Sequence, residues 1–132
     1  MSSSQRIIFA QAQTMYSPGT HSFPPTVVGA GYQSLAMSAT KANWPKRIAD
    51  LFVGHIDLSD DAGQTWQRIA TWRDDGRDVR DNLTGVVLEY SFVRLFLSAR
   101  PDKPVYTHEK TWVRGTFDCT APIITAIAIE CG

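Results

Sequence analysis

Apolar and polar side chains alternate along most of this chain, and the alternating stretches are rich in β-branched and aromatic residues. Successive side chains of a β-strand point to opposite faces, so a period of two is typical of strands with one buried face. Gly, Pro, Asn and Asp break the pattern at short intervals, as turn residues do. A short helix competes at residues 43–51, with Pro45 in its first turn. The pattern as a whole predicts an all-β protein.

The alternation places about eight strands between these turn residues. They cover residues 6–13, 26–28, 32–39, 47–58, 65–72, 86–98, 113–119 and 123–130. Short antiparallel strands bury their apolar faces by forming two packed sheets, and a chain of 132 residues suffices for one such core. We therefore expect a single-domain antiparallel β-sandwich of jelly-roll type over residues 6–132, preceded by a flexible N-terminal arm at residues 1–5.

Net charge and the length of the apolar runs limit the classes of partner that we expect for this chain. Thirteen basic residues balance thirteen acidic ones, so no net field attracts nucleic acid. Apolar runs such as residues 123–129 are far shorter than the roughly 20 residues needed to cross a bilayer. The polar N-terminus carries no signal-peptide pattern, so we expect synthesis in a host cytoplasm. These observations favour neither nucleic acid nor a membrane as a partner.

One segment combines turn residues at a defined spacing, Ser59-Asp60-Asp61-Ala62-Gly63-Gln64-Thr65-Trp66, which reads S-x-D-x-G-x-T-W. The Asp61 carboxylate is expected to accept hydrogen bonds from backbone N–H groups and from the hydroxyls of Ser59 or Thr65. Gly63 permits the positive φ that closes a tight turn, and Trp66 is expected to bury its ring beneath the hairpin. The pattern therefore predicts a structural turn rather than a reactive site.

These eight residues resemble the Asp-box, or bacterial neuraminidase repeat. In the families that share it, the hairpin recurs in β-propeller blades and also occurs singly in other β folds, usually away from the active site. A propeller needs several blades of about 40 residues, and this sequence holds one copy of the motif. The resemblance thus implies a scaffold turn and does not imply sialidase activity.

Residues that carry chemistry do not gather into a recognisable catalytic pattern. His21, His55 and His108 are far apart in the sequence, which gives no support to a zinc or iron site. His55 and Asp57 share one strand face, where a half-buried histidine with its hydrogen-bond acceptor is favoured over a ligand pair. Asp57, Asp60 and Asp61 suggest calcium, but the EF-hand spacing is absent and the turn already uses Asp61. We predict no enzymatic activity, no cofactor and no metal.

The two cysteines, Cys119 and Cys131, are predicted to be free thiols. If residues 113–119 and 123–131 form a hairpin around Pro122, Cys119 lies beside the turn and Cys131 at the far end. At about 3.3 Å per residue the separation exceeds the roughly 7 Å that a disulfide allows between Cα atoms.

Two long loops break the regular spacing of the strands, at residues 73–85 and 99–111. Loops of this length are frequent places of contact with partners, although a solvated excursion is an equal alternative. We hypothesise that these loops and residues 1–7 contact neighbouring subunits, with alternating charges setting the register through ion pairs. The candidate interface residues are Arg73, Asp74, Asp75, Arg77, Asp78, Arg80, Asp81, Tyr106 and His108.

Four tryptophans raise the alternative of carbohydrate binding, because sugars stack on exposed aromatic faces. By alternation, Trp66 and Trp72 are expected to share the inward face of one strand. Trp44 and Trp112 lie beside loops and are the candidate glycan platform, while the competing interpretation makes them rim residues that cover the ends of the core.

The general plan resembles the virion proteins of tailed bacteriophages, such as head-decoration and head or tail accessory subunits. The shared features are a small β-sandwich, zero formal net charge, no catalytic motif, a polar arm and long loops. This resemblance implies a non-enzymatic structural subunit of the virion that binds neighbouring virion proteins and forms a homo-oligomer. The alternative is a carbohydrate-binding β-sandwich module that uses exposed tryptophans.

Overall fold

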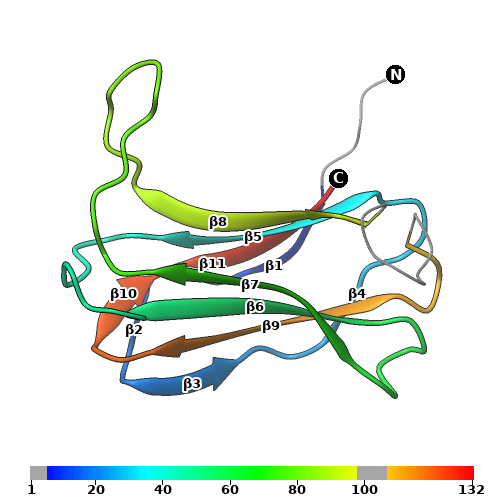
Figure 1. Ribbon diagram of the computed structural model, residues 1–132. Coiled ribbons are helices and arrows are strands. Elements are labelled where there is room, and N and C mark those ends of the chain that lie inside the picture. Colours follow the sequence, from blue (N-terminus) through cyan, green and yellow to red (C-terminus); the bar gives the residue numbers. More distant parts are fainter. Residues whose placement is uncertain (1–5, 98–106) are drawn as a thin grey trace.

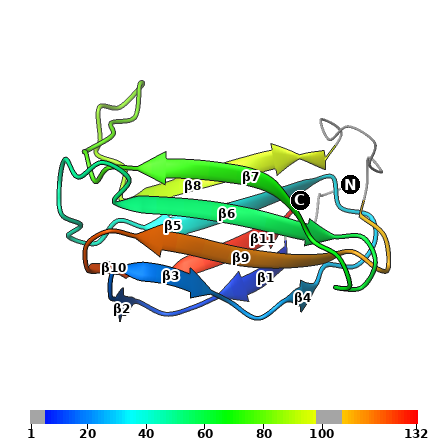
Figure 2. The same cartoon turned by 60° about the horizontal axis from the view of Figure 1, so that its bottom comes forward.

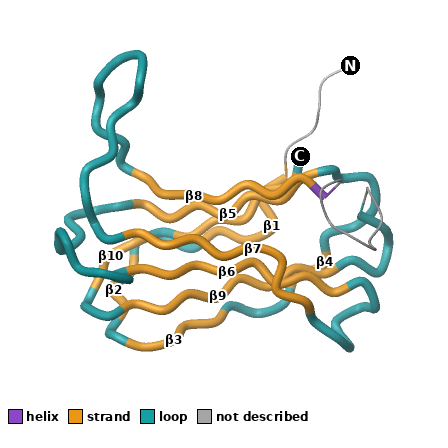
Figure 3. Tube along the Cα trace, in the orientation of Figure 1, coloured by secondary structure: helices purple, strands orange, loops and turns teal. Residues whose placement is uncertain are grey.

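The computed structural model describes residues 6–97 and 107–132, and within these ranges the regular elements are β-strands, with no α-helix. The strands run in antiparallel pairs (Figure 1), and loops and turns connect them (Figure 3). They are β1 (Arg6–Ala10), β2 (Thr14–Tyr16), β3 (Gly19–Ser22), β4 (Thr26–Val27), β5 (Ser34–Thr40), β6 (Phe52–Ser59), β7 (Gln67–Asp74), β8 (Tyr90–Phe96), β9 (Trp112–Cys119), β10 (Ile123–Thr125) and β11 (Ile127–Cys131).

Two sheets form the layers of the molecule, one with the strand order β1-β11-β5-β8 and the other with the order β3-β9-β6-β7. The short strand β4 pairs with β9, and β2 pairs with β10 as a separate ribbon. The two layers face each other, and β7 and β8 lie on the same side of the stack (Figures 1 and 2). The predicted all-β antiparallel sandwich is confirmed, whereas this strand order does not by itself define a jelly roll.

Several predicted strand limits differ from the observed ones. The alternative of a short helix at residues 43–51 is excluded, because Asn43, Arg47 and Asp50 have positive φ values of 54°, 61° and 54° in bends and a turn. The predicted strand at 47–58 accordingly begins only at Phe52. The short strands β2 and β3 were not predicted, because three or four residues are too few to show an alternation.

The predicted strand at residues 123–130 divides at Ala126 into β10 and β11. The Ala126 amide donates to the side-chain hydroxyl of Thr40 at 2.8 Å and not to a backbone carbonyl, so the regular ladder is interrupted there. On either side of this point the chain pairs with different partners, β2 before it and β5 after it.

An aromatic cluster centred on Phe52 fills the core between the layers. The Phe52 ring lies 5.2 Å from Trp44, 5.3 Å from Trp72 and 5.1 Å from Phe117, between ring centroids. Glycine makes room for this packing, because a Cβ added at Gly54 would fall 2.3 Å from the Trp72 ring. The Trp72 indole N–H reaches across to the Ser91 hydroxyl of β8 at 2.9 Å, which links the two sheets.

The two cysteines form no disulfide, as predicted, and both are buried, but the structural reason differs from the predicted one. Cys119 belongs to β9 in one sheet, whereas Cys131 belongs to β11 in the other, so the expected hairpin between them does not form. Burial raises the pKa of the Cys119 thiol, which keeps it protonated and unreactive near neutral pH.

Across the described ranges, no helix has the length and apolar character needed to span a membrane.

The contact between Gly54 and Trp72 generates a first prediction. Gly54→Ala should lower the free energy of unfolding by about 1 to 3 kcal/mol, because the new methyl group displaces the Trp72 ring. Urea denaturation followed by circular dichroism measures the change. In a Trp72→Leu background the same substitution should cost clearly less, since the smaller side chain leaves space. An equal cost in both backgrounds would show that the ring contact is not the cause.

Candidate functional site

The turn between β6 and β7, residues 59–66, is ordered by a network around Asp61, and we call it the Asp61 turn. The Thr65 amide donates to Asp61 Oδ1 at 2.9 Å, and the Thr65 hydroxyl donates to Asp61 Oδ2 at 2.5 Å. The Ser59 hydroxyl donates to Asp61 Oδ1 at 2.7 Å and accepts the Gly63 amide at 2.8 Å. Gly63 has a φ of +87°, a conformation that glycine adopts without steric cost. The contacts expected of Asp61 are therefore present.

These donors also determine the charge state of the turn. The hydroxyl and the amide of Thr65, followed by the Ser59 hydroxyl, lower the pKa of Asp61 to about 2. A carboxylate that is ionised and already engaged by several donors is a poor proton carrier near neutral pH. The geometry is that of a rigid connection between two strands.

The two tryptophans of this hairpin lie on opposite faces, so the prediction that Trp66 shares the inward face with Trp72 is wrong. A bulge shifts the register of the β6–β7 ladder, since Ile56 pairs with Ala70 while Asp57 pairs with Arg68. One extra residue reverses the face of every side chain before it. Trp66 is half-buried on the outside, with the Arg114 guanidinium 4.4 Å above its ring.

A polar cluster covers the outer face of the β3-β9-β6-β7 sheet, around a carboxylate that is almost fully buried. Asp57 is 2% exposed and accepts hydrogen bonds from Arg68 Nε at 2.9 Å and Arg114 Nη2 at 3.1 Å. These side chains line a groove of about 550 Å³ that also includes Thr116. The two guanidinium groups neutralise the carboxylate and satisfy its oxygen atoms.

His55 lines the same groove. The sequence suggested that Asp57 is its hydrogen-bond partner, but the structure gives His55 other partners. Its Nδ1 lies 2.9 Å from the Thr71 hydroxyl and its Nε2 lies 3.4 Å from Asp118 Oδ2. A short hydrogen bond from the Thr20 hydroxyl, followed by the contact with His55, lowers the pKa of Asp118. The network thus consists of engaged partners, and we see no exposed nucleophile in it.

Sequence reasoning missed the roles of Arg68, Arg114 and Asp118. Their outward positions could be guessed from alternation, but the contacts depend on the pairing of β6 with β7 and with β9. Asp57 stands opposite Arg68 on one side and Arg114 on the other only in this register. A single-residue slip would have separated them.

The three carboxylates considered for calcium do not converge. Asp57 is occupied by two arginines, Asp61 by the donors of its turn, and Asp60 lies 3.6 Å from His108 Nε2. Within residues 6–97 and 107–132, no group of three or more His, Cys, Asp or Glu side chains is placed to hold a metal ion.

The loop predicted at residues 73–85 continues into a hairpin that projects from one end of the sandwich (Figure 1). Arg80 and Val87 form an isolated bridge, and the Leu88 amide donates to the Val79 carbonyl at 2.7 Å. The Asp81 carboxylate accepts the amides of Leu83 and Thr84 at 2.8 and 2.9 Å, which closes the tip. We call residues 79–88 the projecting hairpin.

The charged side chains of this loop have partners within the chain. Four ion pairs join Arg73 to Asp50, Asp74 to Lys41, Asp75 to Arg77 and Asp78 to Lys46, at 2.8 to 3.1 Å. Arg80 donates to the Gly85 carbonyl at 2.9 Å. Ion pairs to another subunit would therefore compete with these contacts, so the charges serve first to order the loop. Tyr106 lies outside the described residues.

Trp44 and Trp112 do not form a glycan platform. Trp44 is 5% exposed, packs against Phe52 at the first residue of β6, and donates its indole N–H to the Ile124 carbonyl at 2.9 Å. Trp112 is half-buried and pairs with Ser59, the last residue of the same strand. Trp44 covers one end of the core, as the competing interpretation expects, whereas the Trp112 ring lies against Gly63 of the Asp61 turn, outside the core.

Comparison with known proteins places the chain in no established family: no family model, curated protein or solved structure matches it. The class that the fold defines is an antiparallel β-sandwich with two polar networks on its surface, one around Asp57 and one around Asp61.

The burial of Asp57 generates a second prediction. Asp57→Asn should lower the free energy of unfolding by about 1 to 3 kcal/mol, because two guanidinium groups lose a charged acceptor that water does not replace. Asp50→Asn is the matched control, since Asp50 pairs with Arg73 at the same 2.9 Å distance but is exposed. Its cost should stay below about 0.5 kcal/mol. Urea denaturation compares the two, and equal costs would contradict the assignment.

A third prediction follows from the lowered pKa of Asp61. A carboxyl group with a lower pKa in the folded state contributes stability above its unfolded pKa of about 4 and loses that contribution as the pH falls toward 2. Wild-type protein should therefore have a higher urea midpoint than Asp61→Asn at neutral pH, and the difference should shrink below pH about 4. Parallel pH profiles for the two proteins would count against the network described here.

Proposed function

We propose that the chain is a non-enzymatic structural subunit of a viral particle, of the tailed-bacteriophage kind, that binds neighbouring virion proteins and further copies of itself. The proposal takes its class from the resemblance in overall plan. The carboxylates of the two polar networks are engaged by arginines, hydroxyls and amides, an arrangement suited to holding structure rather than to turnover. Such a protein functions by burying surface area against neighbouring subunits.

The projecting hairpin is the observation that carries the proposal. Its tip residue Leu83 is 96% exposed, and Val79 and Val86 are 51% and 61% exposed. The hydrogen bonds of Asp81 and Arg80 hold these apolar side chains in a defined position. An ordered apolar tip loses little conformational freedom on docking, so burying Leu83 in a neighbour's pocket would favour binding.

The edge strand β1 offers a second contact in the same proposal. Its partner β11 lies on one side, and no strand of the described residues pairs with the other side of β1. Ile7 is 60% exposed on this strand. An unpaired edge is a template for a strand from another chain, and the arm at residues 1–5 precedes it in the sequence.

A fourth prediction tests the hairpin. Leu83→Asp should reduce association with particles by on the order of tenfold or more, because a charge would enter the apolar contact. The measurement is density-gradient fractionation of a lysate that contains native particles, with the chain detected by mass spectrometry. Met15→Asp is the matched control, since Met15 is 67% exposed on β2, away from the hairpin.

The control variant should enter particles at the wild-type level, and both variants should keep the wild-type circular dichroism spectrum. Wild-type chain that remains in the soluble fraction, without particles, would overturn the proposed function. If Leu83→Asp and Met15→Asp reduced particle association equally, the projecting hairpin would not be the contact site.

A further inference from the structure

The outer face of the β1-β11-β5-β8 sheet carries a row of exposed aromatic rings that the functions discussed above do not use. Along β8, alternate side chains point outward, and Tyr90, Phe92 and Phe96 are 47%, 50% and 58% exposed. The rings of Tyr90 and Phe92 are 5.6 Å apart at their centroids and tilted by 37°. A monomeric protein rarely leaves adjacent large rings in water without a use for them.

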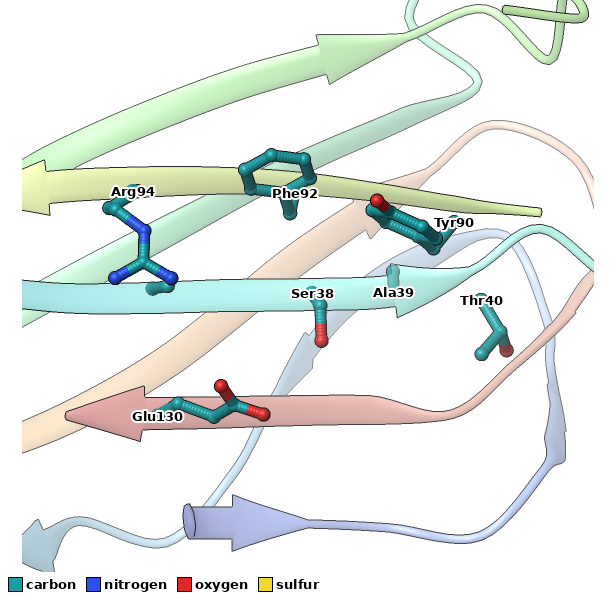
Figure 4. A pocket seen from close by; sticks show the side chains of 8 residues that line it. Ser38, Ala39, Thr40, Tyr90, Phe92, Arg94 and Glu130 are labelled. Carbon is teal, nitrogen blue, oxygen red and sulfur yellow. The ribbon is translucent and has the colours of Figure 1, made fainter. Parts of the chain in front are cut away.

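A hollow of about 310 Å³ lies beside Tyr90 and Phe92, over three neighbouring strands (Figure 4). The small side chains of Ala36 and Ser38 on β5 form its floor. In the β5–β8 ladder, Ser38 pairs with Phe92 and Ala36 pairs with Arg94. On the far side, Ala36 pairs with Glu130 of β11. Small residues between larger ones leave this space open, in the size range of pockets that bind small molecules.

The lining combines apolar rings with donors and acceptors of both kinds. Arg94 supplies guanidinium donors, Glu130 supplies a carboxylate acceptor, and the hydroxyls of Ser38 and Thr40 can do either. The two charges cancel, so neither an anion nor a cation is favoured by the hollow as a whole. A ligand that fits this set is neutral, rich in hydroxyl groups, and has an apolar face for the rings.

We infer that this hollow is a carbohydrate-binding site for a neutral oligosaccharide. The C–H face of a sugar ring would lie against Phe92 and Tyr90, while its hydroxyl groups donate to Glu130 and accept from Arg94. The site is distinct from the Trp44 and Trp112 pair, which the fold separates. The inference does not depend on the proposed role in a particle.

The unpaired state of Glu130 favours a sugar over a second copy of the chain. Among the described residues, its carboxylate has no hydrogen bond or ion pair, whereas Arg94 donates to the Ser34 hydroxyl at 3.4 Å. An apolar protein surface over the hollow would strip water from this carboxylate without replacing the lost hydrogen bonds. A sugar supplies the missing donors and still covers the rings.

The test is titration calorimetry of the full chain with cellohexaose, maltohexaose, xylohexaose and chitohexaose. At least one of these oligosaccharides should bind, and Phe92→Ala should weaken that binding by on the order of tenfold. Phe96→Ala is the matched control, because Phe96 is an equally large exposed ring on the same face of β8 but does not line the hollow. Its affinity should stay within about twofold of wild type. Glu130→Gln should also weaken binding, since a neutral acceptor forms weaker hydrogen bonds.

Three outcomes would overturn the inference. The first is that none of the four oligosaccharides binds the wild-type chain. The second is an equal loss for Phe92→Ala and Phe96→Ala, which would indicate general stickiness of the aromatic row. The third is a wild-type dimer in sedimentation that Phe92→Ala dissociates, which would make a second copy the occupant. None of these outcomes bears on particle association through Leu83, so the two proposals fail separately.

Discussion

The packing of aromatic rings around Phe52 is the contact on which the rest of this structure depends. Phe52 touches Trp44 from the preceding turns, Trp72 from β7 and Phe117 from β9, so one side chain joins three separate parts of the chain. The absent side chain at Gly54 lets the Trp72 ring lie flat across the strand. From there its indole N–H bonds to β8 and holds the two sheets together at one side.

Because the rings fill the interior, polar and functional features are left to the surfaces and the ends. One outer face carries the paired Asp57 cluster, and the other carries the open hollow beside Phe92. The contrast between the two is physical. In the first, arginines already satisfy the Asp57 carboxylate, while in the second Glu130 lines the hollow in which we propose that a sugar binds. The ends carry the Asp61 turn and the projecting hairpin, which connect strands and extend the reach of the molecule.

Local chemistry accounts for the parts of the site that the sequence predicted correctly. The Asp61 turn could be derived because the hydrogen bonds of the Asp61 carboxylate lie within residues 59–66, so spacing and residue type suffice. The face on which Trp66 lies could not be derived in this way, because the bulge between Ile56 and Asp57 moved it to the outer face. Bulges depend on how two strands pair, and a single strand does not reveal them. The thiols were predicted correctly as free, although through a hairpin that does not exist.

The sequence by itself determined that the chain folds into antiparallel strands with one buried face, because side-chain alternation is a property of each segment alone. It also determined the turn at Asp61, for the same local reason. Only the tertiary structure decided that Trp44 is buried, that Asp57 meets Arg68 and Arg114, and that Phe92 and Glu130 border one hollow. Those contacts join residues far apart in the chain. They are set by strand order and register, and the alternation of side chains is compatible with many orders and registers.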